Sequence, residues 1–137
     1  MNNFNIAYFA FDQFIPSEHA GFVHTYSIVK ALREIGNEVT LYGIPNGLDL
    51  FNLFKWTDSY ENVPFNYVRF IVSFKLKYKL FYPLNFISYH KTLDAVRKQN
   101  PDLIHERFHL PHPYSIKISE KVNTPKILAV NELLRDE

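Results

Sequence analysis

The sequence contains no cysteine, only four glycines and no long hydrophobic run. The absence of cysteine among its 137 residues excludes disulfides and thiolate metal sites. No apolar run reaches the roughly 18 residues that a membrane-spanning helix needs, and the N-terminus lacks the basic start of a signal peptide. The net charge is only +1, so no strong field would attract nucleic acid. We therefore expect a cytoplasmic protein without a nucleic-acid partner.

Apolar side chains are plentiful. Hydrophobic residues make up 47% of the chain, with 13 phenylalanines and 9 tyrosines, which excludes a disordered protein. A chain of this length removes roughly two thirds of its surface from water when it folds. We therefore expect one domain over residues 1–137, with most aromatic side chains in its core.

The first 45 residues predict a strand, a helix and a second strand. Asn5–Ala10 is a short apolar run typical of a strand buried on both faces, and a loop follows it. A helix is predicted over Gly21–Ile35, and Gly36 suits the left-handed residue that ends a helix. Glu38–Ile44 is the second strand, so this part predicts a right-handed parallel βαβ unit. The apolar stripe of the helix comprises Phe22, Thr25, Ile28, Val29, Leu32 and Ile35.

The rest of the chain continues the alternation of strands and helices. Residues 48–62 have no clear pattern and suit a short helix or a loop, whereas Phe65–Phe74 is predicted as a strand. Helices are predicted over Pro83–Gln99 and Pro113–Val122, and a strand over Pro125–Val130. The alternation predicts an α/β fold, a Rossmann-like parallel sheet with helices on both faces. The stripe of the helix over residues 83–99 comprises Phe86, Tyr89, Leu93 and Val96.

One of the few glycines stands at the start of the first predicted helix. Ligands of parallel sheets bind at the carboxyl ends of the strands, where Gly21 is expected. The backbone N–H groups and the dipole of a helix favour an anion at its N-terminus, and a missing side chain lets a phosphate approach. The stretch fits neither the dinucleotide-binding fingerprint nor a P-loop. Its spacing leaves open whether Gly21 serves an anion or only allows a tight turn or close packing.

Three stretches occur in an order that one enzyme family shares. They are Asn5–Val39, within which Asn5–Ala10, Ala20–His24 and Lys30–Val39 carry the likeness, then Pro101–Phe108 and Lys126–Glu137. Together they resemble the N-terminal domain of a retaining glycosyltransferase of the two-domain GT-B fold, in glycosyltransferase family 4 (group 1). The resemblance implies that the chain is the front half of a GT-B fold and a fragment of a longer two-domain chain. It also implies a C-terminal donor-binding domain, in cis or in trans.

The resemblance further implies transfer of a sugar from a nucleotide-sugar donor to a glycan or lipid-linked acceptor. No metal and no other cofactor are implied, the catalytic residues are not identified, and this segment alone is expected to be inactive. Gly21 and His24 would face the donor diphosphate. The implied cleft residues on the acceptor side are Glu106, Arg107, Asn131 and Glu137. The alternative is a non-catalytic module of a split transferase that binds a nucleotide, a sugar or a partner subunit.

A competing motif lies at His105–His109, which fits the pattern H-E-x-x-H. On a helix the two histidines would share a face and could hold zinc, with Glu106 as the general base. However, Pro111 and Pro113 would end such a helix, and the α/β alternation needs a strand here. On a strand the two histidines lie about 13 Å apart, too far to chelate one zinc ion. A zinc hydrolase is therefore a minor alternative.

Basic residues alternate with apolar ones in the middle of the chain. Lysines and arginines near an anionic lipid surface are attracted by about 1 kcal/mol each, and aromatic side chains suit the interface. The stretch is therefore a candidate for peripheral contact with the inner face of the membrane, although an ordinary strand with solvated lysines would look the same. Its basic residues are Arg69, Lys75, Lys77 and Lys79.

Overall fold

The computed structural model of the chain describes residues 3–46, 55–68, 82–108 and 113–130. Several residues that the sequence singles out therefore lie outside the described part. They are the two cleft residues Asn131 and Glu137 and the basic residues Arg69, Lys75, Lys77 and Lys79.

A single mixed sheet is the centre of the described fold. Its six strands have the order β3-β4-β2-β1-β5-β6. All neighbouring strands are parallel except β3, which runs antiparallel to β4. The predicted Rossmann-like α/β fold is confirmed. The strands are β1 (Asn5–Ile15), β2 (Glu38–Pro45), β3 (Thr57–Tyr60), β4 (Val63–Tyr67), β5 (Leu103–Phe108) and β6 (Lys126–Val130).

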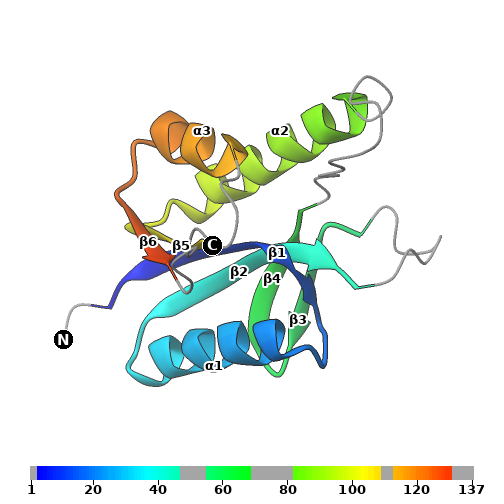
Figure 1. Cartoon of the computed structure of the whole chain (residues 1–137). Helices are drawn as coiled ribbons and strands as arrows, with labels where there is room; N and C mark the ends of the chain where they lie inside the picture. Colours follow the sequence, from blue (N-terminus) through cyan, green and yellow to red (C-terminus); the bar gives the residue numbers. More distant parts are fainter. Residues whose placement is uncertain (1–2, 47–54, 69–81, 109–112, 131–137) are drawn as a thin grey trace, which may run out of the picture.

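Helices cover both faces of the sheet, as the alternation predicts. Helix α1 (Ala20–Glu34) packs on one face, and helices α2 (Tyr82–Gln99) and α3 (Pro113–Val122) pack on the other (Figure 1). The apolar run of β1 contributes side chains to the core on each face of the sheet, because successive side chains of a strand point to opposite faces. Tyr8 belongs to the core under α1, whereas Phe9 belongs to the core under α2 and α3.

The order of the strands reverses beside β1. The chain proceeds from β1 to β2 and then to β4 on one side, and it crosses to the other side to form β5 and β6. In open α/β sheets, ligands bind outside the carboxyl ends of the strands at such a switch point. The fold therefore directs attention to the carboxyl ends of β1 and β5.

The end of α1 confirms the role predicted for Gly36. This residue has φ +100°, and its N–H donates to the carbonyl oxygen of Arg33 at 2.9 Å. The N–H of Asn37 donates to the carbonyl oxygen of Leu32 at 3.2 Å, which completes a Schellman motif. The side chain of Asn37 also accepts a hydrogen bond from the backbone of Phe4 at 3.0 Å, so the helix end is tied to the start of β1.

The first strand is longer than the sequence predicts. β1 does not end at Ala10 but continues to Ile15, through residues expected in a loop. Ala10 pairs with Gly43 of β2, and the next pair is Phe14 with Ile44. Residues 11–13 therefore form a bulge, which a periodicity of two cannot reveal. Bulges often re-aim side chains next to functional sites.

Other boundaries and burial assignments also differ. Within residues 48–62, the described part is not a helix but includes β3, and the strand expected over Phe65–Phe74 begins earlier, at Val63. Ile35 caps α1 and is exposed, so its assignment to the apolar stripe is wrong. Phe86, which the sequence assigns to the stripe of α2, is also exposed, at 55%, near the start of that helix. Leu93 and Val96, further along the same stripe, are buried. Helical spacing gives the face of a helix but not how far the core extends along it.

Candidate functional site

Three segments meet at the switch point of the sheet. They are the bulge of β1, the first turn of α1 and the end of β5, which carries Arg107. The Nη1 atom of Arg107 donates to the carbonyl oxygen of Gly21 at 2.7 Å and to Oγ1 of Thr25 at 3.1 Å. Thr25 is fully buried, so its hydroxyl serves this polar contact in place of the apolar role expected from the stripe. The guanidinium group thus joins β5 to the beginning of α1.

Close packing explains why residue 21 is a glycine. A Cβ atom at Gly21 would clash with Oε1 of Gln13 and lie 3.1 Å from Nη1 of Arg107. The amide group of Gln13 is held in turn, because its Nε2 donates to Oδ2 of Asp12. Protein side chains therefore fill the space that the missing Cβ leaves.

The N-terminus of α1 nevertheless keeps its ability to attract an anion. Its first turn contains no acidic residue, and the N-cap residue His19 makes no capping hydrogen bond with its side chain. The first N–H groups of a helix have no partner within the helix and carry partial positive charge. Arg107 adds a full positive charge at the same place. A guanidinium group beside a helix N-terminus is favourable where a negative group balances both.

Four buried polar atoms cluster around this site and have no hydrogen-bond partner in the described part of the chain. Tyr8 is fully buried, and burial raises the pKa of its hydroxyl, while nearby Arg107 lowers it and Asp12 raises it. Leaving such an atom unpaired costs about 1–3 kcal/mol, so each one needs an explanation such as a bound ligand or water. The atoms are the Tyr8 hydroxyl, Asp12 Oδ1, His105 Nδ1 and Arg107 Nε.

His105 extends the cluster along β5. Its ring stacks on that of Tyr8, with the centroids 4.6 Å apart and the planes 14° from parallel. Burial lowers the pKa of His105 below its usual value of 6.5. The ring therefore favours its neutral form at the centre of the sheet.

The side chains of Glu106 and Arg107, which the sequence assigns to one cleft, lie on opposite faces of the sheet. Adjacent residues of a strand point to opposite faces. Glu106 is buried on the face of α2 and α3, where its Oε2 accepts a hydrogen bond from Lys126 Nζ at 3.0 Å. Arg107 reaches α1 on the other face. The carboxylate of Glu106 is therefore part of an internal ion pair.

The remaining predicted residues are placed as follows. Gly21 lies in the first turn of α1 beside Arg107, while His24 is exposed on the same helix. Sequence reasoning missed Tyr8 and Asp12. A polar residue directly after a buried strand was the available signal for Asp12, but only the strand pairing shows that Tyr8 and Asp12 lie near Arg107.

The zinc interpretation of the H-E-x-x-H motif is not supported. His105 and Glu106 lie on strand β5 instead of a helix, and His109 lies outside the described residues. Both described members are engaged, His105 by Tyr8 and Glu106 by Lys126. Among the residues that the structure describes, no group of three metal-binding side chains comes together. Within the same ranges, no helix is long and apolar enough to cross a membrane.

No family model matches the sequence, and no curated protein matches it either. Among solved structures, the chain is similar to a glycosyltransferase from Rickettsia africae ESF-5, with 16% identity and a TM-score of 0.57. That alignment covers 98% of this chain but 32% of the glycosyltransferase, so the chain spans about a third of its neighbour's length. The C-terminal domain of a hydrogenase from Pyrococcus furiosus is also similar, with 16% identity, a TM-score of 0.50, and coverage of 91% of this chain and 89% of that domain. These likenesses establish a shared Rossmann-like α/β fold.

Proposed function

We propose that the chain is the N-terminal, acceptor-side domain of a GT-B glycosyltransferase similar to family 4. Such an enzyme transfers a sugar from a nucleotide-sugar donor to a glycan or lipid-linked acceptor. Two observations support the proposal. The order of the three sequence stretches resembles that family, and a glycosyltransferase matches the fold over 98% of this chain. The donor would bind mainly to a C-terminal domain, in cis or in trans.

The arrangement around Arg107 is the observation that carries the proposal. A positive side chain and the first N–H groups of α1, which the His19 side chain does not cap, occupy the switch point together, next to Gly21. Asp12 is the described acid nearby, and one of its oxygens has no described partner. A diphosphate group would balance the remaining positive charge and accept hydrogen bonds from the helix. In the proposed enzyme, this group belongs to the donor.

The proposal gives each side chain a limited role. Arg107 positions the first turn of α1 and contributes charge, while the amides of Gly21 and Phe22 face the diphosphate. His24 would approach the donor only from the exposed side of α1. Asn131 and Glu137 remain predicted cleft residues on the acceptor side. Glu106 is left out, because Lys126 already pairs with its carboxylate.

A titration with diphosphates tests the proposal. Pyrophosphate, UDP and GDP are added to the isotopically labelled 137-residue protein, and the backbone amide signals are followed by NMR. We expect shifts at Gly21 and Phe22, and about tenfold weaker binding by Arg107→Gln, since a charge-assisted hydrogen bond contributes about 1.5–3 kcal/mol. Arg33→Gln is the matched control, because Arg33 lies at the opposite end of α1 and bonds to Val39 instead.

Two results would overturn the proposal. One is the absence of any shift at the start of α1 with about 10 mM diphosphate, well above a millimolar dissociation constant. The other is equal weakening by the Arg33 variant. The amide spectrum of each variant must stay dispersed, so that lost binding is not confused with lost folding. The chain alone should not release nucleoside diphosphate from a sugar donor, and steady release would contradict the assignment of the donor site to another domain.

A non-catalytic binding module is the second candidate. It is favoured by the hydrogenase neighbour, because 89% of that C-terminal domain is covered, so this fold also occurs as a domain outside glycosyltransferases. A module would bind a nucleotide or sugar without transferring it, with or without a donor domain. Sugar transfer by the protein together with a donor domain would exclude this candidate.

A further inference from the structure

A hollow lies on the face of the sheet opposite Arg107. Helices α2 and α3 pack side by side on that face (Figure 1), and between them is a cavity of about 230 Å³. From α2, Phe86, Tyr89 and His90 line it, and from α3, Tyr114 and Lys117. The described part of its wall therefore consists of aromatic rings and one cationic side chain.

The rings of the wall hold one another in place. Phe86 and His90 meet edge to face with centroids 4.4 Å apart, and Tyr89 meets His90 at 5.2 Å. Tyr89 also contacts Tyr114 of α3 at 5.5 Å. Such ring pairs are stabilising beyond the area they bury. The wall is therefore formed before any ligand arrives, which lowers the entropy cost of binding.

The aromatic wall is not covered by the rest of the described chain. Phe86 is 55% exposed. Ile87, which follows Phe86 in the sequence, and Ile116, which precedes Lys117, are each 49% exposed. Scattered apolar residues on a surface are ordinary. Here, however, an exposed phenylalanine lines a preformed cavity, and ligand sites are concave, mostly apolar and preformed.

The charge at the cavity is positive. Lys117 is exposed, and no ion pair joins it to another described residue. The imidazole of His90 has ring nitrogens that can donate or accept hydrogen bonds. A ligand in this cavity would therefore gain from a flat ring against the aromatic side chains and from an anionic substituent near Lys117.

The volume limits the size of the ligand. A cavity of about 150 Å³ holds benzene, and drug-sized ligands occupy roughly 300–1,000 Å³. We propose that the cavity between α2 and α3 binds a single six-membered ring that bears a carboxylate or phosphate. A sugar acid or sugar phosphate and an aromatic acid share this chemistry. The site is separate from the diphosphate site and does not depend on the proposed function.

An NMR titration with three single-ring probes tests the site. Glucuronate represents the charged sugar, glucose the same ring without charge, and benzoate the aromatic acid. We expect a dissociation constant on the order of 1 mM for an anionic probe, as for other ligands of about 10 heavy atoms, with shifts at Tyr89, His90 and Tyr114. Lys117→Gln should weaken this binding about threefold to fivefold, in the range of an exposed ion pair. Phe86→Ala should weaken it further.

The matched control is Lys121→Gln, which removes an exposed lysine from the same helix without touching the cavity. Phe86 and Lys117 are exposed, so their replacement should leave the fold intact. Stronger binding of glucuronate than of benzoate supports a sugar anion as the ligand, and the reverse order supports an aromatic acid. Three results would each overturn the proposal. The first is equal binding of glucuronate and glucose with no binding of benzoate. The second is an equal effect of the two lysine variants, and the third is the absence of shifts at the lining residues. Arg107→Gln should leave this binding unchanged, which separates it from the diphosphate site.

Discussion

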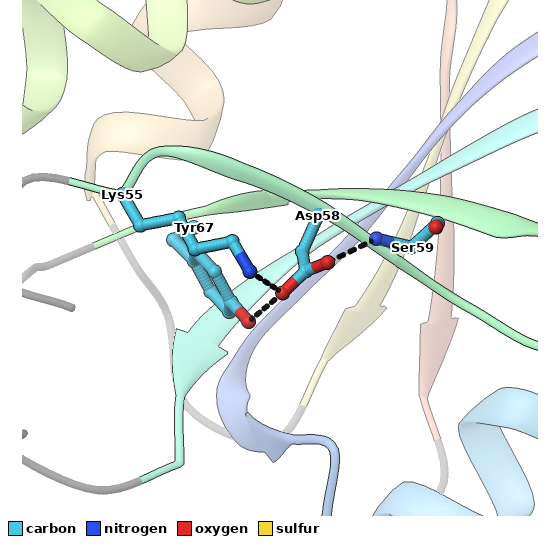
Figure 2. A network of polar contacts seen from close by, with 4 residues as sticks. All are labelled: Lys55, Asp58, Ser59 and Tyr67. Atoms are coloured by element: carbon cyan, nitrogen blue, oxygen red, sulfur yellow. Dashed lines mark hydrogen bonds and ion pairs between the residues drawn. The ribbon is translucent and has the colours of Figure 1, made fainter.

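Each edge of the sheet carries an ion pair between a lysine and an acidic residue, but the two pairs differ in their exposure to solvent. At the β3 edge, Lys55 contacts Asp58, which also accepts hydrogen bonds from the Tyr67 hydroxyl at 3.3 Å and the backbone of Ser59 at 2.8 Å (Figure 2). The side chains of Lys55 and Asp58 are 45% and 31% exposed. At the β6 edge, the side chains of Lys126 and Glu106 are 17% and 5% exposed. The first pair is hydrated and the second is internal.

The same asymmetry extends through the two halves of the sheet. β3 is short and polar, which are features that protect an edge strand from pairing with another chain. On β6, by contrast, Ile127, Leu128 and Val130 are each about half exposed, at 50%, 43% and 52%. The four buried polar atoms without a described partner lie on β1 and β5, and none lies on β2, β3 or β4. The strands at and beyond the switch point, β1, β5 and β6, therefore carry the described features that cost stability.

The largest expected effect on stability is that of replacing Lys126, and the matched replacement of Lys55 should have almost none. Lys126→Met should reduce the free energy of unfolding by about 3 kcal/mol, because it leaves the buried carboxylate of Glu106 without its cation. Lys55→Met should change it by less than about 0.5 kcal/mol, as is usual for exposed pairs. Urea denaturation at pH 7 measures both. The double variant Glu106→Gln/Lys126→Met should recover most of the loss, and equal effects of the two single lysine variants would remove the distinction between the edges.

Removal of the Arg107 side chain should have the next largest effect. Arg107→Ala breaks two hydrogen bonds of a charged group and should cost about 2 kcal/mol. Arg107→Lys keeps the charge, but its side chain is one atom shorter and lacks the Nη1 group that reaches both Gly21 and Thr25, so it should restore only part of the stability. Thr25→Val removes one of the two acceptors and should cost less than Arg107→Ala. If Arg107→Lys is as stable as the wild type, the charge alone is sufficient and the reach of the guanidinium group does not matter.

The elements of the fold were largely predictable because their signals are local. Gly36 ends α1 as its position indicates, and the sequence patterns place β2, α2, α3 and β6 close to their observed bounds. β3 was missed since a short polar strand has no apolar period, and it exists by pairing with β4. The bulge in β1 was missed for a similar reason, because only the register against β2 reveals it.

The candidate site was less predictable than the fold. Gly21 and Arg107 were identified, and they do contact each other. Glu106 was assigned to the same cleft because it is next in sequence, yet the alternation of a strand separates the two side chains. The contribution of Tyr8 depends on contacts between residues far apart in the sequence, so no local pattern could show it.

The pH dependence of stability should distinguish the β5 half from the rest of the chain. Burial lowers the pKa of His105, so the folded protein resists protonation at this ring. As the pH falls below about 6.5, the ordinary value for histidine, the unfolded chain takes up a proton that the folded chain does not. The contribution of His105 to stability is therefore fully present above about pH 6.5, and it is lost progressively until the lowered pKa of the folded state is reached.

Urea midpoints between about pH 7.5 and 5 measure this effect, over the range in which a histidine changes charge. His105→Phe should flatten the curve while keeping an aromatic ring against Tyr8. His24→Gln is the control, because His24 is exposed on α1 and its replacement should leave the slope unchanged. A slope that persists in His105→Phe would assign the pH dependence to other groups.

A lysine placed on each edge should have the smallest effect on stability, but only the lysine on β6 should improve solubility. Ile127→Lys introduces a charge at an exposed apolar position of β6, where the side chain can reach water, so the free energy of unfolding should change by less than about 0.5 kcal/mol. Exposed apolar edge strands promote association between chains, and lysine is a common natural protection against it. Ile127→Lys should therefore raise the concentration at which light scattering detects aggregates. Ser59→Lys on β3 is the matched control. It should leave this concentration unchanged, because that edge is already short and polar. If both variants raise this concentration equally, the gain reflects net charge alone, and the apolar surface of β6 does not distinguish the two edges.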